Sequence, residues 1–177
     1  MANEKSEHDR LMEQVRTAES RLAFAIGTFV MRFAMLEGAI NHAIGVILRT
    51  PTMDVTKVVT APIINVNIRL DILSSLINGY KMKKETRSQF NTEIGKSRKL
   101  NDYRNWLVHD QWGGYMPVTD HWQKIKPEVR EKFRLKKQNF SPEEINKKSD
   151  DCARLIGDFY DTTRAYVSRR DKPKPSR

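Results

Sequence analysis

The chain contains few residues of the kinds that support metal or covalent chemistry. Its 177 residues include one cysteine, Cys152, so an internal disulfide is excluded and a reducing compartment is favoured. Cys152 lies in a predicted helix with no histidine nearby in the sequence, and we expect it to pack in the core rather than act as a nucleophile. Glycine-rich phosphate loops, paired-cysteine metal sites and internal repeats are missing as well. We therefore expect no cofactor and no metal site.

Acidic residues are also in deficit. There are 22 of them against 32 lysines and arginines, which gives a formal net charge of +10 and a sequence pI near 9.8. Such a balance favours polyanionic partners such as RNA or DNA, which bind with release of counterions. A secretory signal is absent because the first twenty residues are mostly charged and polar. We expect a cytoplasmic protein.

One long apolar stretch, residues 22–48, is present, and its length alone would suffice to cross a bilayer. Arg32 and Glu37 near its middle argue against that interpretation, because each would be costly in hydrocarbon. The simpler interpretation of this stretch is the central helix of a bundle. We expect no contact with a membrane. Its predicted core stripe consists of Leu22, Ile26, Phe29, Phe33, Leu36, Ile40, Ala43 and Ile47.

Further helices are predicted by apolar residues at helical spacing and by start and stop signals. They cover residues 66–77, 84–111 and 142–169, with a short turn of helix at 53–60. Residues 1–20 are predicted to form a first helix or a helical lead-in to the central one. Partial strand character at 115–118 and 132–138 indicates a hairpin or an ordered loop, in which Pro117 and Pro127 confine any strand to an edge. The expected fold is all-α, an up-and-down bundle of four to five helices with this insertion before the last helix. A single domain at 1–169 would precede a disordered basic tail at 170–177.

The densest group of reactive side chains is the segment Leu100–Trp112, which joins Arg104, Asn105 and His109 within six residues. At about 100° per residue, Asn105 and His109 stand about 40° apart on a helix, whereas Arg104 and His109 diverge by about 140°. The amide and the imidazole can share a pocket. Arginine joins them only if its side chain curls back, if the helix is irregular, or if a second subunit completes the site.

The motif Arg104-Asn105-Trp106-Leu107-Val108-His109 resembles the signature of HEPN domains, helical bundles of which many are metal-independent endoribonucleases. The resemblance implies a homodimer that brings two motifs together over one RNA backbone. By the same resemblance, Arg104 would hold the scissile phosphate, Asn105 would orient it, and His109 would move the proton. It also implies a stress or phage-defence toxin, with an antitoxin or another regulatory protein as partner. Gln111 stands where many such toxins carry a tyrosine, so regulation by tyrosine modification is not expected.

Two polar residues of the central helix are predicted to support this site. Glu37 and Asn41 are four residues apart and share one helix face. A carboxylate among apolar neighbours needs a cationic or hydrogen-bonding partner, and Arg104 is the expected one. The alternative is that Glu37 lies at a solvated edge, pairing with Arg32 or with nothing.

Basic residues near the motif and in the insertion are the candidates for contacting RNA. The set comprises Lys96, Arg98, Lys99, Lys124, Lys126, Lys136 and Lys137. Lysines and arginines interleaved with aromatic residues such as Trp122 can follow a phosphate backbone and stack on single-stranded bases. The alternative is a solvated basic face and a flap whose aromatic residues pack on the bundle.

The function expected from these features is metal-independent cleavage of single-stranded RNA. The main alternative is a non-catalytic binding or scaffold module in which Arg104 and His109 hold a helix junction. A nucleotide-sensing domain is a weaker third interpretation, because nothing in the sequence specifies a base pocket.

Overall fold

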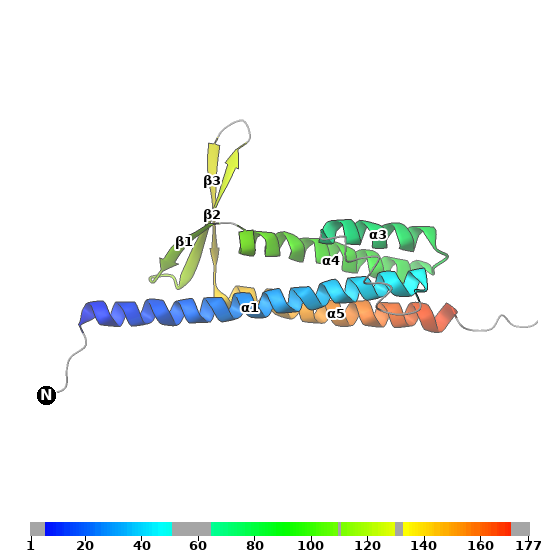
Figure 1. The fold of residues 1–177 in the computed structure, drawn as a ribbon, viewed down its shortest axis with the longest axis horizontal. Coiled ribbons are helices and arrows are strands. Elements are labelled where there is room, and N and C mark those ends of the chain that lie inside the picture. The colour runs from blue at the N-terminus through cyan, green and yellow to red at the C-terminus, as the bar shows by residue number, and fades with distance from the viewer. Residues whose placement is uncertain (1–5, 51–64, 110, 130–132, 171–177) are drawn as a thin grey trace, which may run out of the picture.

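The structure is a computed structural model that describes residues 6–50, 65–109, 111–129 and 133–170 (Figure 1). The described elements are four helices, α1 (Glu7–Leu48), α3 (Val66–Gly79), α4 (Lys84–His109) and α5 (Pro142–Arg170). Three strands, β1 (Gln111–Met116), β2 (His121–Val129) and β3 (Phe133–Phe140), lie between α4 and α5. A helical bundle with a small insertion before the last helix is therefore confirmed. The predicted turn at 53–60 and the tail beyond Arg170 lie outside the described residues.

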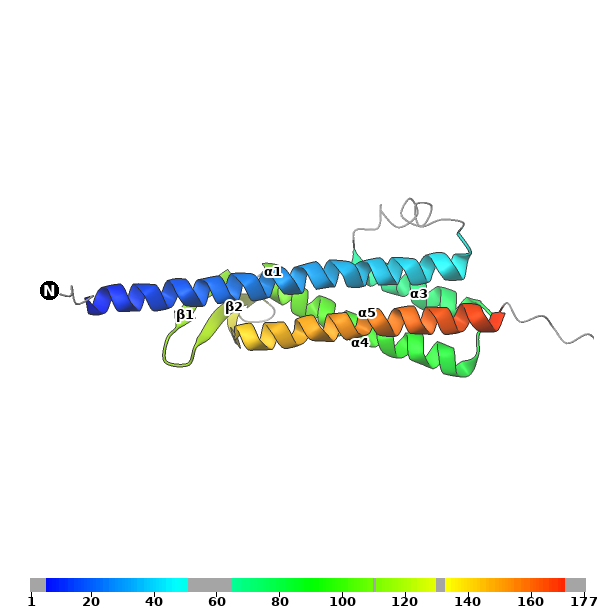
Figure 2. The same ribbon diagram turned by 90° about the horizontal axis from the view of Figure 1, so that it is seen from below.

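The bundle has two layers around one apolar core. α1 and α5 lie side by side in one layer, and α3 and α4 form the other (Figures 1 and 2). Among the described helices, α4 is antiparallel to α1, α3 and α5, so α1 and α3, which are consecutive in this set, point in the same direction (Figures 1 and 2). The central side chains, among them Phe29, Phe90 and Phe159, are fully buried.

α1 is one continuous helix, so the segment 1–20 forms a lead-in to the predicted helix 22–48 and not a separate first helix. Val15, Ala18 and Leu22 continue the core stripe at helical spacing without a breaker between them, whereas Leu11 is exposed. The helix begins at Ser6, whose hydroxyl accepts a hydrogen bond from the Asp9 backbone N–H while the Asp9 carboxylate accepts one from the Ser6 N–H. This reciprocal cap fixes the start of the helix.

Arg32 and Glu37, the two charged residues near the middle of the apolar stretch, each pair with a neighbouring helix. By length and composition α1 could span a membrane, and a third of its most apolar window is buried. Arg32 donates to Asp150 of α5 at 2.5 Å, and Arg69 of α3 donates to Glu37 at 3.1 Å. These pairs and the apolar stripe together attach α1 to two neighbouring helices.

The insertion is a three-stranded antiparallel sheet in the order β1-β2-β3, larger than the expected hairpin. The predicted segment 132–138 corresponds to β3, the segment 115–118 overlaps only the end of β1, and β2 was not predicted. Gly113 and Gly114 give the start of β1 little strand propensity. The structure explains why both positions are glycine. A Cβ on Gly113 would lie 2.9 Å from Ile125 Cδ1, and Gly114 has a φ of +120°, which other residues rarely adopt. Pro127 sits in the central strand, but past the end of β1, where β2 pairs with β3 alone.

Glu93 of α4 is a buried carboxylate, 4% exposed, whose Oε1 accepts a hydrogen bond from the Thr162 hydroxyl of α5 at 2.5 Å. Burial raises its pKa above the usual value of 4.5. The folded state therefore holds this proton more tightly than the unfolded state does, and stability falls as the pH rises from 4.5 through the raised pKa. Glu93→Gln should raise the melting temperature at pH 8 and change it little at pH 4.5. An equal effect at both pH values would contradict this assignment.

Candidate active site

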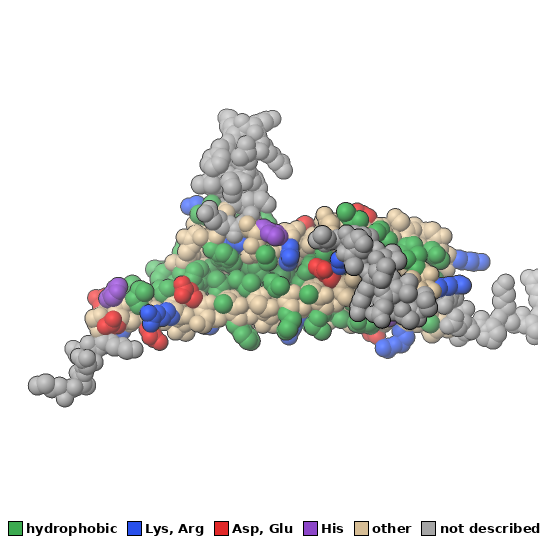
Figure 3. Space-filling view, in the orientation of Figure 1, with side chains coloured by type: hydrophobic (Ala, Val, Ile, Leu, Met, Phe, Trp, Pro, Cys, Tyr) green, Lys and Arg blue, Asp and Glu red, His purple; other side chains and the backbone are tan. Residues whose placement is uncertain are grey.

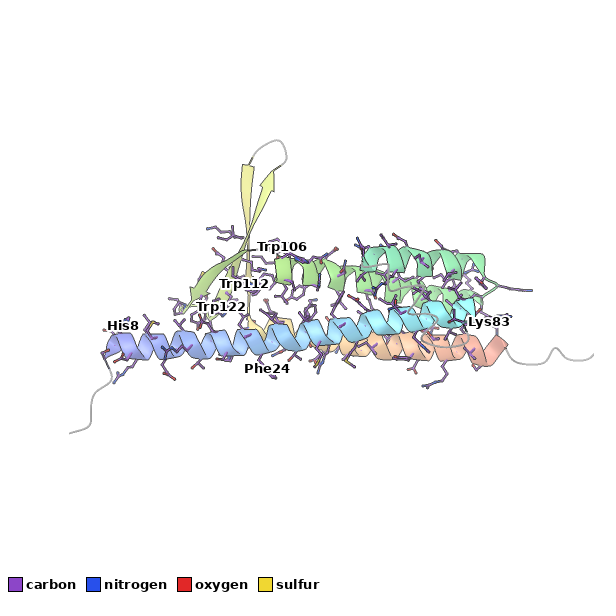
Figure 4. The ribbon with its side chains drawn as sticks, in the orientation of Figure 1. His8, Phe24, Lys83, Trp106, Trp112 and Trp122 are labelled. Atoms are coloured by element: carbon purple, nitrogen blue, oxygen red, sulfur yellow. The ribbon has the colours of Figure 1, made fainter. Side chains whose placement is uncertain are left out.

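Aromatic packing fixes the half of α4 that carries the motif. The Tyr103 ring lies edge-on to Phe29 of α1 at 5.4 Å and 5.7 Å from Phe140, and the Trp106 ring lies 6.3 Å from Phe140. Burial raises the pKa of the Tyr103 phenol far above its usual value. Figure 4 shows Trp106, Trp112 and Trp122 together where α4 meets the sheet. These ring contacts hold the part of α4 that carries the motif against α1 and the end of β3.

A buried lysine holds the end of α4. Lys124 of β2 is 0% exposed, and its Nζ donates to the carbonyl oxygens of Trp106 and Leu107 at 2.7 and 2.8 Å. The same ammonium lies 4.6 Å from the centre of a Trp112 ring. Because the last carbonyls of a helix lack partners within the helix, this lysine acts as a C-terminal cap. The prediction that Lys124 contacts RNA is wrong, because its ammonium group is buried and bonded to the helix end.

The three motif side chains come together within one protomer. Arg104 Nη1 lies 3.2 Å from Asn105 Oδ1 and 3.1 Å from His109 Nε2. The arginine side chain curls back along α4, which is one of the arrangements that the helix geometry left open. A second subunit is not needed to bring these three groups together.

The contact between Arg104 and His109 involves the ring nitrogen Nε2. A guanidinium has only donors, so a hydrogen bond forms here only when Nε2 acts as the acceptor. An unprotonated ring nitrogen is also the group that can take a proton from a hydroxyl group.

The motif lies at the surface. Asn105 and His109 are exposed, and Arg104 is half-buried. In the space-filling view a histidine and a basic side chain lie where α4 ends, next to an apolar area between the sheet and α1 (Figure 3). A polyanion can therefore reach the guanidinium and the imidazole directly.

The two predicted supporting residues on α1 are placed differently from expectation. Glu37 accepts from Arg69 of α3 at 3.1 Å, so its expected pairing with Arg104 is wrong. Asn41 is half-buried, and its Oδ1 has no hydrogen-bond partner among the described residues. The sequence offered no signal for Arg69, because the residues that join α1 and α3 do not fix which cation reaches Glu37.

The remaining basic candidates that the structure describes are divided among different surroundings. Arg98 donates to Asp71 of α3 at 2.6 Å, and Lys96 lies 3.5 Å from Asp158 of α5. Lys96 and Lys99 line a groove of about 590 Å³ between α4 and α5, which also contains Asp151, Asp158 and Asp161. Its mixed charge does not favour a polyanion. In the sheet, Lys137 is exposed, whereas the side chains of Lys126 and Lys136 lie outside the described part of the chain.

The turn between β1 and β2 is tied to the helices by a polar network. The Tyr115 hydroxyl donates to Asp120 at 2.7 Å, and Arg21 of α1 reaches both Asp120 at 3.4 Å and Glu143 of α5 at 2.6 Å. The hydrogen bond from Tyr115 is the main reason that the pKa of Asp120 lies below its usual value. These contacts hold the sheet, and with it Lys124, against the bundle.

Comparison of the sequence with models of known protein families gives no match, and neither do comparisons with curated proteins or with solved structures. The chemistry proposed below therefore depends on the motif and on the geometry of its side chains.

Proposed function

We propose that this protein is a metal-independent endoribonuclease that cleaves single-stranded RNA, as its motif resemblance to HEPN domains implies. One observation carries the proposal. The guanidinium of Arg104 lies within 3.2 Å of both the Asn105 amide oxygen and the His109 imidazole, at an accessible helix end. In the described part of the chain, no group of histidine, cysteine, aspartate and glutamate could hold a metal ion.

The reaction begins when the guanidinium of Arg104 leaves His109 for a phosphate of the RNA, which offers a charged, bidentate acceptor. Nε2 is then free to take the proton from the ribose 2'-hydroxyl. The 2'-oxygen attacks the adjacent phosphorus and forms a 2',3'-cyclic phosphate, while the bond from phosphorus to the 5'-oxygen breaks. Arg104 stabilises the added negative charge of the transition state, and Asn105 orients the phosphate.

The leaving 5'-oxygen requires a proton from a second group. One motif contains one histidine, so we assign this step to the protonated His109 of the partner subunit in a homodimer. The products are a 2',3'-cyclic phosphate and a 5'-hydroxyl. A stress or defence toxin restrained by an antitoxin or a regulatory protein is the biological role that the motif resemblance suggests.

A substrate without the attacking group tests this chemistry. An RNA oligonucleotide should be cut in the presence of EDTA, whereas the all-2'-deoxy oligonucleotide of the same sequence should remain intact, because DNA lacks the 2'-hydroxyl. Both substrates should be followed by denaturing gel electrophoresis at equal enzyme concentration. Cleavage of the deoxy substrate at a similar rate would exclude attack by a 2'-hydroxyl.

A non-catalytic binding module is the second candidate function, and one observation favours it. The contact between Arg104 and His109 occupies the nitrogen that the reaction needs, as a purely structural contact at a helix end would. In that case the protein would bind RNA or a protein without producing fragments, and Arg104→Ala would lower the melting temperature without any activity to lose.

A further inference from the structure

A second groove between α4 and α5 is lined by carboxyl and hydroxyl side chains, and we call it the acidic groove. Its volume of about 510 Å³ lies within the usual range of small-molecule sites. Four carboxylic acids line it, Glu85 and Glu93 of α4 and Asp158 and Asp161 of α5. Lys96 is the only cation among the described residues that line it. Such a group of acids is unexpected in a protein with a formal net charge of +10.

The floor of the acidic groove contains a buried carboxyl group with one unused oxygen. Glu93 and Thr162 both line the groove and are only 4% and 5% exposed, whereas Glu85, Asp158 and Asp161 are exposed and form its rim. The Thr162 hydroxyl donates to Oε1 of Glu93. The other oxygen, Oε2, has no hydrogen-bond partner among the described residues. A buried acceptor without a donor costs stability, and the cost is larger when the group is charged.

Within the described ranges, no basic side chain reaches Oε2 of Glu93. Lys96 lies 3.5 Å from Asp158 on the rim. Arg164 lies 3.5 Å from Asp161, one turn before it on α5. Both nearby cations therefore pair with the rim and not with the floor.

The carboxyl group of Glu93 holds its proton tightly in these surroundings. Burial raises its pKa, and the negative charge of Asp158 adds to this effect. The hydrogen bond from Thr162 and the positive charge of Lys96 act in the opposite direction. A cation that contacts Oε2 stabilises the ionised carboxylate, so its binding displaces the proton.

We propose that the acidic groove binds a linear aliphatic polyamine, with one ammonium group on Oε2 of Glu93 and further ammonium groups at the carboxylates of the rim. The inference does not depend on RNA cleavage. It rests on the unused buried oxygen, on the shape of the acceptor and on the charges of the rim.

The number of unused oxygens favours an ammonium group over a guanidinium. A guanidinium binds a carboxylate best through both oxygens, but Oε1 of Glu93 already accepts from Thr162. An ammonium group is a compact charge with three donors, so one of them can bind Oε2 while another binds a hydroxyl oxygen of the groove. In the described part of the chain, no group of histidine, cysteine, aspartate and glutamate could hold a metal ion, so an organic cation fits better.

The rim favours a ligand with more than one positive charge. Glu85 precedes Glu93 by eight residues, which is about 12 Å along the axis of α4. Asp158 and Asp161 line the opposite wall, on α5. A chain with ammonium groups several methylenes apart can contact the floor and the rim together, whereas a single ammonium group contacts only one of them.

Calorimetric titration of the full-length protein with spermidine tests this inference. The wild type should bind spermidine at pH 7.5, and Glu93→Gln should weaken binding by about 30-fold or more, because the ammonium group loses its buried charged partner. Glu13→Gln, at an exposed position of α1, is the matched control and should bind like the wild type. Butylamine, with one ammonium group, should bind about 10-fold more weakly than spermidine. His109→Ala should bind like the wild type, which separates this result from loss of cleavage.

Release of the Glu93 proton is a second readout. At pH 5 the binding enthalpy of the wild type should vary with the ionisation enthalpy of the buffer, and that of Glu93→Gln should vary much less. The affinity of the wild type should rise as the pH increases from 4.5 through the raised pKa, because the proton competes with the ammonium group.

Removing the lysine of the rim should strengthen binding. Lys96→Met leaves Asp158 without its partner, so spermidine should bind several-fold more tightly than to the wild type. Equal affinities of Glu93→Gln and Glu13→Gln would overturn the inference. So would butylamine that binds as tightly as spermidine, or binding at pH 5 without release of a proton.

Discussion

Replacing His109 with alanine is expected to slow the cleavage of single-stranded RNA by about 10²–10⁴-fold, the usual contribution of a general acid or base. In a homodimer the substitution removes the base from one protomer and the acid from the other, so the upper part of this range applies. Initial rates on a fluorescent RNA oligonucleotide in EDTA measure the effect.

The control for this experiment is Val108→Ala, which changes an exposed neighbour on the same turn of α4. It should retain the wild-type rate. Because His109 is itself exposed, both variants should keep the wild-type melting temperature. Equal rates for His109→Ala and Val108→Ala would show that the imidazole takes no part in the reaction.

Replacing Lys124 with methionine is expected to lower the free energy of unfolding by roughly 3 kcal/mol, because it leaves two helix-end carbonyls without their charged donor. For a chain of this size the melting temperature should fall by about 6–12 °C. Since the capped turn carries His109, the rate of RNA cleavage should fall as well.

The same experiment separates a structural lysine from an RNA-binding one. Lys137→Met, at an exposed position of β3, is the matched control and should change stability little. If Lys124 contacted phosphate instead, its loss would leave the melting temperature unchanged and would reduce the salt dependence of RNA binding.

The helices could be predicted because apolar residues recur at helical spacing, and because local signals mark their ends. Ser141, Pro142 and Glu144 predicted the start of α5, and the structure has the reciprocal hydrogen bonds between Ser141 and Glu144. The continuity of α1 was harder to see, because its first two turns are polar outside the stripe.

The contacts between distant residues could not be predicted in the same way. Lys124 lies 17 and 18 positions from the carbonyls that it caps, and a lysine in a basic segment looks like a surface residue. Similarly, Glu37 could have paired with any nearby cation, and only the packing of α3 on α1 selects Arg69. The convergence of Arg104 on His109 depends on a side-chain conformation, which the helical spacing left open.

The most direct test of the proposed chemistry is the identity of the RNA ends produced in EDTA by the wild type and by His109→Ala. Mass spectrometry of the fragments should find a 2',3'-cyclic phosphate and a 5'-hydroxyl with the wild type, and intact RNA with the variant. Equal cleavage by both proteins, a requirement for a divalent cation, or 3'-hydroxyl ends would contradict the assignment of Arg104 and His109 as the reacting pair.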